Sequence, residues 1–126
     1  MPHAISYNSD AGVIEIKVQG DFFLSEAQEM ISEALDVAKE QNCFLLLCDL
    51  RAATVKLSTV EIYQLPNVVS DKSASLGLHP HKLKRAFVVT NDLKDYDFFE
   101  TVTVNRGQSA KVFRDVDEAQ KWLLEK

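Results

Sequence analysis

A nearly unbroken apolar run, Phe-Leu-Leu-Leu-Cys-Asp-Leu at residues 44–50, constrains the fold more than any other feature of this chain. A run of this length without polar alternation is typical of a strand that is buried on both faces. Sites in open α/β sheets collect at the C-terminal ends of such strands. We therefore expect any functional site to lie within residues 49–59, between this strand and the next helix.

The size and charge of the chain limit its class. At 126 residues it predicts a single domain, residues 1–126, that is long enough to bury a sizeable core. The formal net charge of −5 disfavours binding to nucleic acid or to an anionic membrane surface, because both need a basic field. This charge does not exclude a protein partner.

The two cysteines, Cys43 and Cys48, indicate a reducing compartment. Their odd separation within one predicted strand places them on opposite faces, where they do not readily form a disulfide. The first residues lack the charged and then apolar pattern of a signal peptide, and no apolar run approaches membrane-spanning length. We therefore expect a cytoplasmic protein without membrane insertion.

The N-terminal region predicts a hairpin followed by a helix. Residues 4–7 and 13–18 are β-prone and flank a turn-rich linker at 8–12. Ser25 is a natural N-cap, with Gln28 at the third helical position. The inner face of this helix is predicted from apolar residues at helical spacing: Ala27, Met30, Ile31, Ala34, Leu35 and Ala38.

A second helix is predicted soon after the buried strand, across a short loop. The spacing of Ser58 and Glu61 is that of a capping box, in which serine and acid exchange hydrogen bonds with each other's backbone. Because Pro66 breaks a helix interior, we expect a short helix from residue 59 to about 65 that stops or restarts at the proline. The segment 70–80 has the glycine and proline of a loop.

The C-terminal half predicts a strand, a helix, a strand and a helix. The strands are residues 85–90 and 110–113, and the helix between them is capped by Asp92 or Asp95. Asp115 caps the last helix. The inner face of that helix is formed by Val116, Ala119, Trp122 and Leu123.

The element order is therefore β-β-α-β-α-β-α-β-α. Strands that alternate with helices imply parallel neighbours joined by right-handed crossovers. The predicted fold class is α/β: a mixed sheet of four to five strands with an N-terminal hairpin and about four helices, most of which pack on one face of the sheet.

This order, together with several short motifs, resembles the STAS-like domain of bacterial anti-sigma factor antagonists. It is also similar to small stand-alone bacterial proteins described as STAS-like or CRAL-TRIO-like. The motifs that carry the resemblance span nearly the whole chain: Gly20-Asp21, Cys48-Asp49-Leu50-Arg51, Leu57-Ser58-Thr59, Phe98-Phe99-Glu100, Asn105-Arg106-Gly107, Val112-Phe113-Arg114-Asp115, Glu118-Ala119 and Trp122-Leu123. The resemblance implies one STAS-like domain over the whole chain.

The resemblance also implies a regulatory function. In anti-sigma factor antagonists, the partner kinase phosphorylates a serine at the start of the second helix, and phosphorylation abolishes binding. By position, Ser58 or Thr59 would be the phospho-acceptor here, and Asp49 would match the acidic residue that ends the preceding strand. The implied partner is a protein, such as an anti-sigma factor or a kinase-like regulator.

The same residues have simpler structural explanations. Ser58 as a helix cap contributes ~1 kcal/mol without any further role. Asp49 and Arg51 can form a local ion pair worth ~0–1 kcal/mol if exposed. Alternatively, Asp49 and Arg51 join Asp21 and Asn91, at neighbouring strand ends, in a small polar pocket.

Apolar residues near the starts of the first two helices offer a binding surface. Three consecutive bulky residues at 22–24 cannot all face inward. Leu57 and Tyr63 pose the same question on the second helix, on either side of Glu61. We expect most of these residues to be core, and the exposed ones to contact a protein partner, a ligand or a second copy in a homodimer.

The sequence contains no catalytic constellation. His79 and His81 lack a neighbouring cysteine or carboxylate and make a poor zinc site, and the Cys48 thiol is inert in an apolar strand. We therefore expect no enzymatic activity, no metal and no cofactor. The favoured function is a regulatory protein-binding module. The alternative is a small-ligand protein whose pocket between helices and sheet holds a lipid or a nucleotide.

Overall fold

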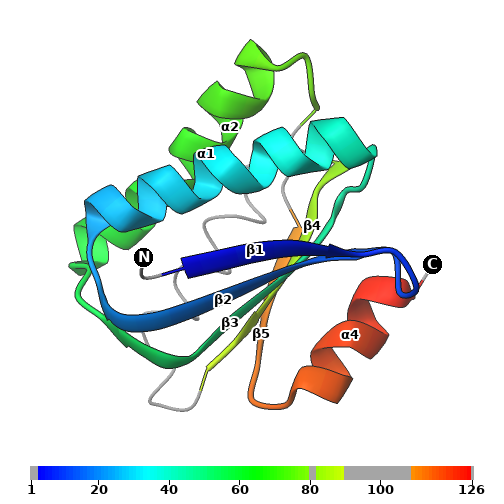
Figure 1. Cartoon of the computed structure of the whole chain (residues 1–126). Coiled ribbons are helices and arrows are strands. Elements are labelled where there is room, and N and C mark those ends of the chain that lie inside the picture. The colour runs from blue at the N-terminus through cyan, green and yellow to red at the C-terminus, as the bar shows by residue number, and fades with distance from the viewer. Residues whose placement is uncertain (1–2, 80–81, 90–108, 126) are drawn as a thin grey trace.

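The computed structural model of the chain describes residues 3–79, 82–89 and 109–125. Within them, the elements follow the predicted order (Figure 1). The strands are β1 (His3–Asn8), β2 (Val13–Phe22), β3 (Leu45–Val55), β4 (Lys84–Val88) and β5 (Ser109–Phe113). The helices are α1 (Leu24–Gln41), α2 (Thr59–Ser75) and α4 (Val116–Leu124). The helix expected after Asp92 or Asp95 lies outside the described residues.

The sheet confirms the predicted mixed topology. Its five strands lie in the order β1-β2-β3-β4-β5; β1 is antiparallel to β2, and every other neighbouring pair is parallel. Helices α1 and α2 cover one face of the sheet, and α4 covers the other (Figure 1). None of the helices described is long and apolar enough to cross a membrane.

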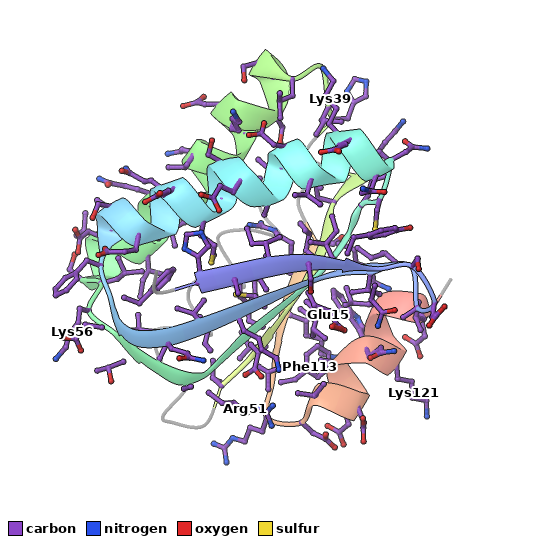
Figure 2. The ribbon with its side chains drawn as sticks, viewed as in Figure 1. Glu15, Lys39, Arg51, Lys56, Phe113 and Lys121 are labelled. Carbon is purple, nitrogen blue, oxygen red and sulfur yellow. The ribbon has the colours of Figure 1, made fainter. Side chains whose placement is uncertain are left out.

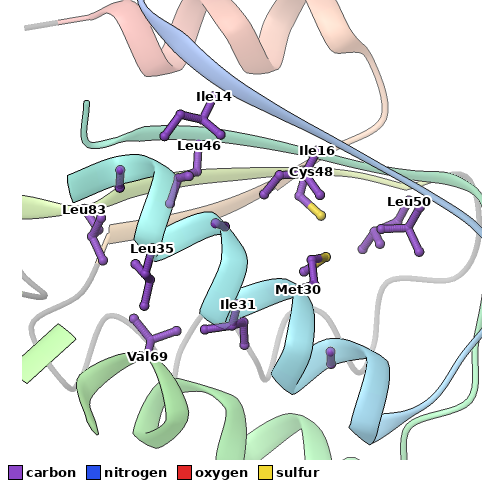
Figure 3. Packing of buried hydrophobic residues seen from close by; sticks show 14 of the residues in the cluster. Ile14, Ile16, Met30, Ile31, Leu35, Leu46, Cys48, Leu50, Val69 and Leu83 are labelled. Atoms are coloured by element: carbon purple, nitrogen blue, oxygen red, sulfur yellow. The ribbon is translucent and has the colours of Figure 1, made fainter. Parts of the chain in front are cut away.

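The apolar stripe predicted for α1 is confirmed in full. All six of its residues are buried against the sheet and α2. Figure 3 shows Met30 of α1 directed toward Cys48 of β3, and Leu35 of α1 directed toward Val69 of α2. We call this cluster of buried residues, which joins α1 to the sheet and to α2, the α1 layer; it is the main core of the described part of the domain.

The predicted cap of α1 is wrong. The helix begins at Leu24, and its N-cap residue is Phe23, whose side chain makes no capping hydrogen bond. Ser25 lies in the first turn, where its Oγ donates to Glu26 Oε2 at 3.0 Å. The reason is that β2 continues to Phe22, so the helix follows the strand directly and no loop remains for Ser25 to close.

The loop expected directly after Leu50 is also wrong, because β3 continues to Val55. Lys17 pairs with Asp49 but Gln19 pairs with Ala52, so β3 carries one extra residue, a β-bulge. The bulge resets the alternation of side chains. Leu50 before it and Val55 after it therefore both reach the α1 layer.

Helix α2 contradicts the predicted stop at Pro66 and the predicted loop from residue 70. The helix runs through the buried Pro66 to Ser75. A proline costs one helical hydrogen bond, and the burial of Ile62 and Val69 on either side of it offsets that cost. The helix ends in a Schellman motif at Gly77, where Gly77 N–H donates to Ala74 O and the next residue's N–H donates to Ser73 O.

Candidate functional site

Ser58 forms the predicted capping box at the start of α2. Its Oγ accepts a hydrogen bond from Glu61 N–H at 3.2 Å, and its own N–H donates to Glu61 Oε1 at 2.8 Å. Ser58 is exposed to solvent, and Glu61 is half-buried. The cap therefore satisfies two backbone donors and still presents a hydroxyl-bearing residue at the surface.

Two exposed apolar side chains lie at the same end of the molecule. Phe23 precedes α1 and is 47% exposed, and Val60 in the first turn of α2 is 66% exposed. The two segments are tied together, because Lys56 N–H donates to Phe22 O at 2.8 Å. Lys56 marks this end in Figure 2. We call Phe23, Ser58 and Val60 together the Ser58 patch.

The other residues predicted around α2 divide between core and surface. Leu57 is half-buried and packs against the α1 layer, so it belongs to the core more than to the surface. Thr59 and Tyr63 lie in the first turns of α2. Of the apolar residues at 22–24, Phe22 is buried, Leu24 is half-buried, and only Phe23 is exposed.

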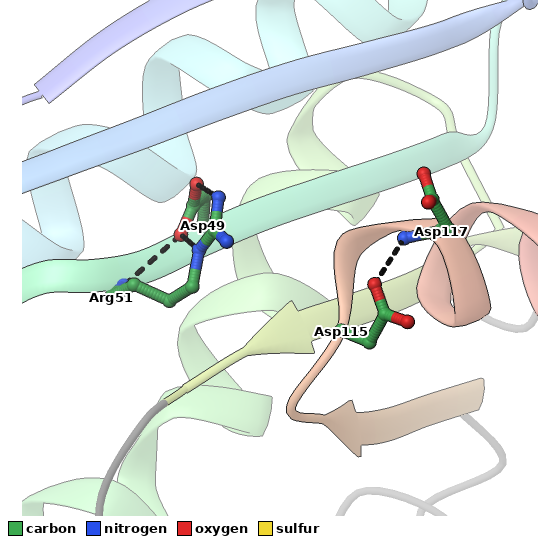
Figure 4. A network of polar contacts seen from close by, with 4 residues as sticks. All are labelled: Asp49, Arg51, Asp115 and Asp117. Atoms are coloured by element: carbon green, nitrogen blue, oxygen red, sulfur yellow. Dashed lines mark hydrogen bonds and ion pairs between the residues drawn. The ribbon is translucent and has the colours of Figure 1, made fainter.

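Asp49 and Arg51 form the local ion pair that the sequence predicts. Arg51 donates from Nε to Asp49 Oδ1 at 2.9 Å and from Nη2 to Asp49 Oδ2 at 2.8 Å, as Figure 4 shows. Asp49 Oδ1 also accepts the backbone N–H of Arg51 at 3.0 Å, next to the bulge. The hydrogen bonds from Arg51 hold the pKa of the Asp49 carboxyl below its usual range. The bidentate ion pair between Asp49 and Arg51 therefore stabilises the backbone at the bulge.

The structure does not bring Asp49 and Asp21 together in one polar pocket. Asp49 lies beside Lys17 on β2, and Asp21 is four residues farther along that strand, which corresponds to ~13 Å. Asp21 is exposed. Asn91, the fourth member of the predicted pocket, lies outside the described residues.

An apolar cavity of about 80 Å³ lies between α1, α2 and the sheet. Its wall includes Met30 and Ile31 of α1, Ile62 and Leu65 of α2, and Leu46 of β3. This is the place where the alternative prediction put a ligand pocket. The Ser58 patch and the cavity share α1 and α2 as their framework.

Arg85 is the residue of this region that the sequence analysis missed. It lies in the cavity wall, is only 6% exposed, and is the one charged side chain among the described residues that line the cavity. Burial lowers the pKa of Arg85 to about 10. The signal was available, because alternation through Leu83, Arg85 and Phe87 places arginine on the apolar face of β4.

The two cysteines are free and buried, as expected. Burial, reinforced by the charge of Asp49, raises the pKa of the Cys48 thiol to about 12, so the thiolate is not populated near neutral pH. Within the described ranges, no three histidine, cysteine or acidic side chains gather in a way that would hold a metal ion. His79 is exposed, and His81 lies outside the described residues.

Comparison with known proteins identifies the fold. No family model matches the sequence, and no curated protein matches it. Among solved structures, the chain is similar to an uncharacterized protein of the DUF3478 family from Shewanella loihica PV-4, described as having a SpoIIAA-like fold. The two are 20% identical over 96% of this chain and 91% of the other, with a TM-score of 0.55. The chain therefore has a SpoIIAA-like fold, as its resemblance to STAS-like domains predicted.

Proposed function

We propose that this protein is a non-catalytic regulatory module that binds a protein partner through the Ser58 patch. The observation that carries the proposal is the pairing of exposed apolar side chains with a polar cap. Phe23 at the start of α1 and Val60, two residues after Ser58 at the start of α2, are both exposed at the end where the two helices begin. Bulky exposed side chains on a surface otherwise rich in polar groups are typical of partner contacts.

The resemblance to anti-sigma factor antagonists supports this placement. It assigns the phospho-acceptor to Ser58 or Thr59, which here are the N-cap and the first residue of α2. A partner of the same type, an anti-sigma factor or a kinase-like regulator, would cover the Ser58 patch. Its apolar contact would be Phe23 and Val60.

The capping box also supplies a reason why phosphorylation would disrupt binding. The positive end of the helix dipole tolerates a phosphate at Ser58. The Glu61 carboxylate, however, already bonds the Ser58 backbone N–H at 2.8 Å, so a phosphate would place a second negative group next to it. Local repulsion would then remodel the cap at the surface while the α1 layer stays intact.

Affinity capture from the lysate of the host, read by quantitative mass spectrometry, tests the proposal. The baits are the wild type, Ser58→Asp, Phe23→Ser and Val60→Ser. Aspartate is itself a good N-cap, so Ser58→Asp keeps the helix while it adds charge. We expect one partner to be enriched by the wild type and lost with all three variants.

The matched control is Leu124→Ser, because Leu124 is 47% exposed, as Phe23 is, but lies at the end of α4. We expect this variant to capture the partner as the wild type does. Equal capture by Phe23→Ser and Leu124→Ser would contradict a binding site at the Ser58 patch. If Ser58→Asp captured the partner as well as the wild type does, while Phe23→Ser and Val60→Ser lost it, the binding site would stand and Ser58 would serve only as a helix cap.

A further inference from the structure

Strand β1 forms one edge of the sheet, and among the described residues no strand pairs with its outer side (Figure 1). Its backbone pairs with β2 alone in that part of the chain. Exposed edges are commonly protected by a proline, a bulge or a charged side chain. β1 contains no proline, lysine, arginine, aspartate or glutamate, and its register with β2 is continuous. The edge is therefore open to pairing with another strand.

The neighbouring strand places two opposite charges behind this edge. Ala4 of β1 pairs with Lys17 of β2. Two residues farther along, Ser6 pairs with Glu15. These side chains lie on the α4 side of the sheet, because Glu15 pairs in turn with Leu47, which is buried beneath α4. Ala4 and Ser6 are small and exposed, so the edge has a positive and a negative position side by side.

These charges distinguish the ways in which two copies of β1 can pair antiparallel about a two-fold axis. Opposed side chains must share a face of the sheet, so the axis passes through one residue position. An axis through Ala4 opposes Lys17 to Lys17 of the second copy, and an axis through Ser6 opposes Glu15 to Glu15. An axis through Ile5 places Ala4 opposite Ser6 of the second copy. Each Lys17 then faces Glu15 of the second copy across two small side chains.

We propose that this protein forms a symmetric homodimer in which two β1 strands pair antiparallel about Ile5 and join the two sheets into one. Like charges oppose the neighbouring registers, and opposite charges favour this one. On the other face, Ile5 packs against the α1 layer and would meet Ile5 of the second copy. Tyr7, which is 36% exposed, would lie opposite His3 of the second copy. The interface uses no residue of the Ser58 patch, so it goes beyond the proposed partner binding.

The length of the strand limits the strength of the dimer. Residues 3–7 of one copy would pair with the same residues of the other, which is a small contact. We therefore expect a reversible dimer with a dissociation constant of ~10–100 µM, typical of weak and transient interfaces. Sedimentation equilibrium of the wild type across this range measures it. A wild type that stays monomeric throughout the range would overturn the proposal.

Charge reversal tests the register. Lys17→Glu opposes two negative groups in each row, and Glu15→Lys opposes two positive groups. We expect either variant alone to dimerise ~5- to 30-fold more weakly than the wild type. An equimolar mixture of the two should recover the wild-type affinity, because each row again pairs opposite charges. Each substitution changes the net charge of −5 by two units, so both variants stay negative and their overall charges do not explain the recovery.

Two controls separate this edge from other surfaces. Lys111→Glu makes the same charge change at an exposed lysine of β5, the opposite edge strand, and should dimerise as the wild type does. Phe23→Ser should also leave the dimer unchanged; its loss would assign the dimer to the Ser58 patch instead. Equal weakening by Lys17→Glu and Lys111→Glu, or a mixture that binds no more tightly than its components, would overturn the proposed pairing.

Oxidative trapping reads the same register if a charge variant does not fold. Ile5→Cys places two thiols opposite each other at the axis, ~4.5–5.5 Å apart at the backbone, where a disulfide can form. Ser6→Cys places them on a diagonal at ~7–8 Å, which a disulfide does not span. Both native cysteines are buried. We expect a covalent dimer from Ile5→Cys only; equal trapping of the two variants, or of neither, would overturn the proposal.

Discussion

The two faces of the sheet are closed in different ways. On one face, α1 and α2 bury the largest apolar cluster among the described residues but leave a cavity with a charged side chain in its wall. On the other face, the nine-residue α4 places Ala119 and Leu123 against Leu47, Ala86 and Val88. The larger of these two interfaces thus contains a cavity.

Polar contacts hold the short helix in place. Lys84 Nζ donates to the carbonyl oxygens of Trp122 at 2.5 Å and Glu125 at 3.2 Å, and it lies 4.4 Å from the centre of the Trp122 ring. A cation at this position satisfies the last carbonyls of α4 and complements the negative end of its dipole. We infer that the α4 face stabilises the domain, and that the α1 and α2 face carries the candidate sites.

Truncation of one leucine on each face should give the largest effects. Leu123→Ala should lower the free energy of unfolding by ~3–5 kcal/mol, because Leu123 is one of the two buried residues of α4. Leu35→Ala should cost less, ~2–3 kcal/mol, because Leu35 borders the existing cavity and has fewer contacts to lose. Urea unfolding of both variants measures the difference. The reverse order would contradict the contrast between the faces.

Removal of the lysine that caps α4 should give the next largest effect. Lys84→Met should lower the free energy of unfolding by ~1–3 kcal/mol, because it removes charged hydrogen bonds to α4. The matched control is Lys111→Met on β5, an exposed lysine 5.5 Å from the Phe113 ring, which should cost ~0.5 kcal/mol or less. Hydrogen exchange of the α4 amides should speed up only in the first variant. Equal hydrogen-exchange rates of the α4 amides in the two variants would contradict the inference that Lys84 stabilises α4.

Enlarging one alanine on each face should shift stability in opposite directions. Ala34→Leu should raise the free energy of unfolding by ~0.5–2 kcal/mol, because it fills space that already exists. Ala119→Leu should lower it by ~1–3 kcal/mol, because Ala119 is fully buried in the α4 contact. Thermal unfolding distinguishes the two, at about 4 °C for each kcal/mol. Shifts of the same sign would mean that the two faces are packed alike.

The parts of this fold that the sequence predicted depend on local or strictly periodic signals. The inner stripe of α1 follows from a helical period, and the Ser58 cap follows from two residues three apart. The N-terminal hairpin follows from two β-prone segments that flank a turn-rich linker. In these cases, one element carries the whole signal.

The parts that the sequence did not predict depend on several elements at once. The extension of β3 requires a bulge, and a bulge interrupts the alternation by which strands are recognised. Helix α2 continues through Pro66 because its packing against the core offsets a lost hydrogen bond. The cavity arises only where side chains from α1, α2 and three strands fail to fill the space between them. The burial of Arg85 was visible in the strand pattern, but its place in the cavity wall was not.

The smallest expected effect tests whether the polar contacts on the α4 face are specific. Arg51→Gln should raise the pKa of Asp49 toward its usual range, because the hydrogen bonds from Arg51 are the main cause of its lowering. Lys17→Gln should raise the pKa less, since Lys17 acts on Asp49 through charge alone. A carboxyl NMR titration of Asp49 measures both shifts.

The sign of the linked stability follows from the lowered pKa. In the wild type, the Asp49–Arg51 pair contributes stability above the pKa of an unfolded aspartate, ~3.9. This contribution is lost as the pH falls through the lower pKa of the folded state. The stability difference between wild type and Arg51→Gln should therefore shrink in acid. A difference that stays constant through this range would show that Arg51 supports the bulge by packing, and that charge on the α4 face is incidental.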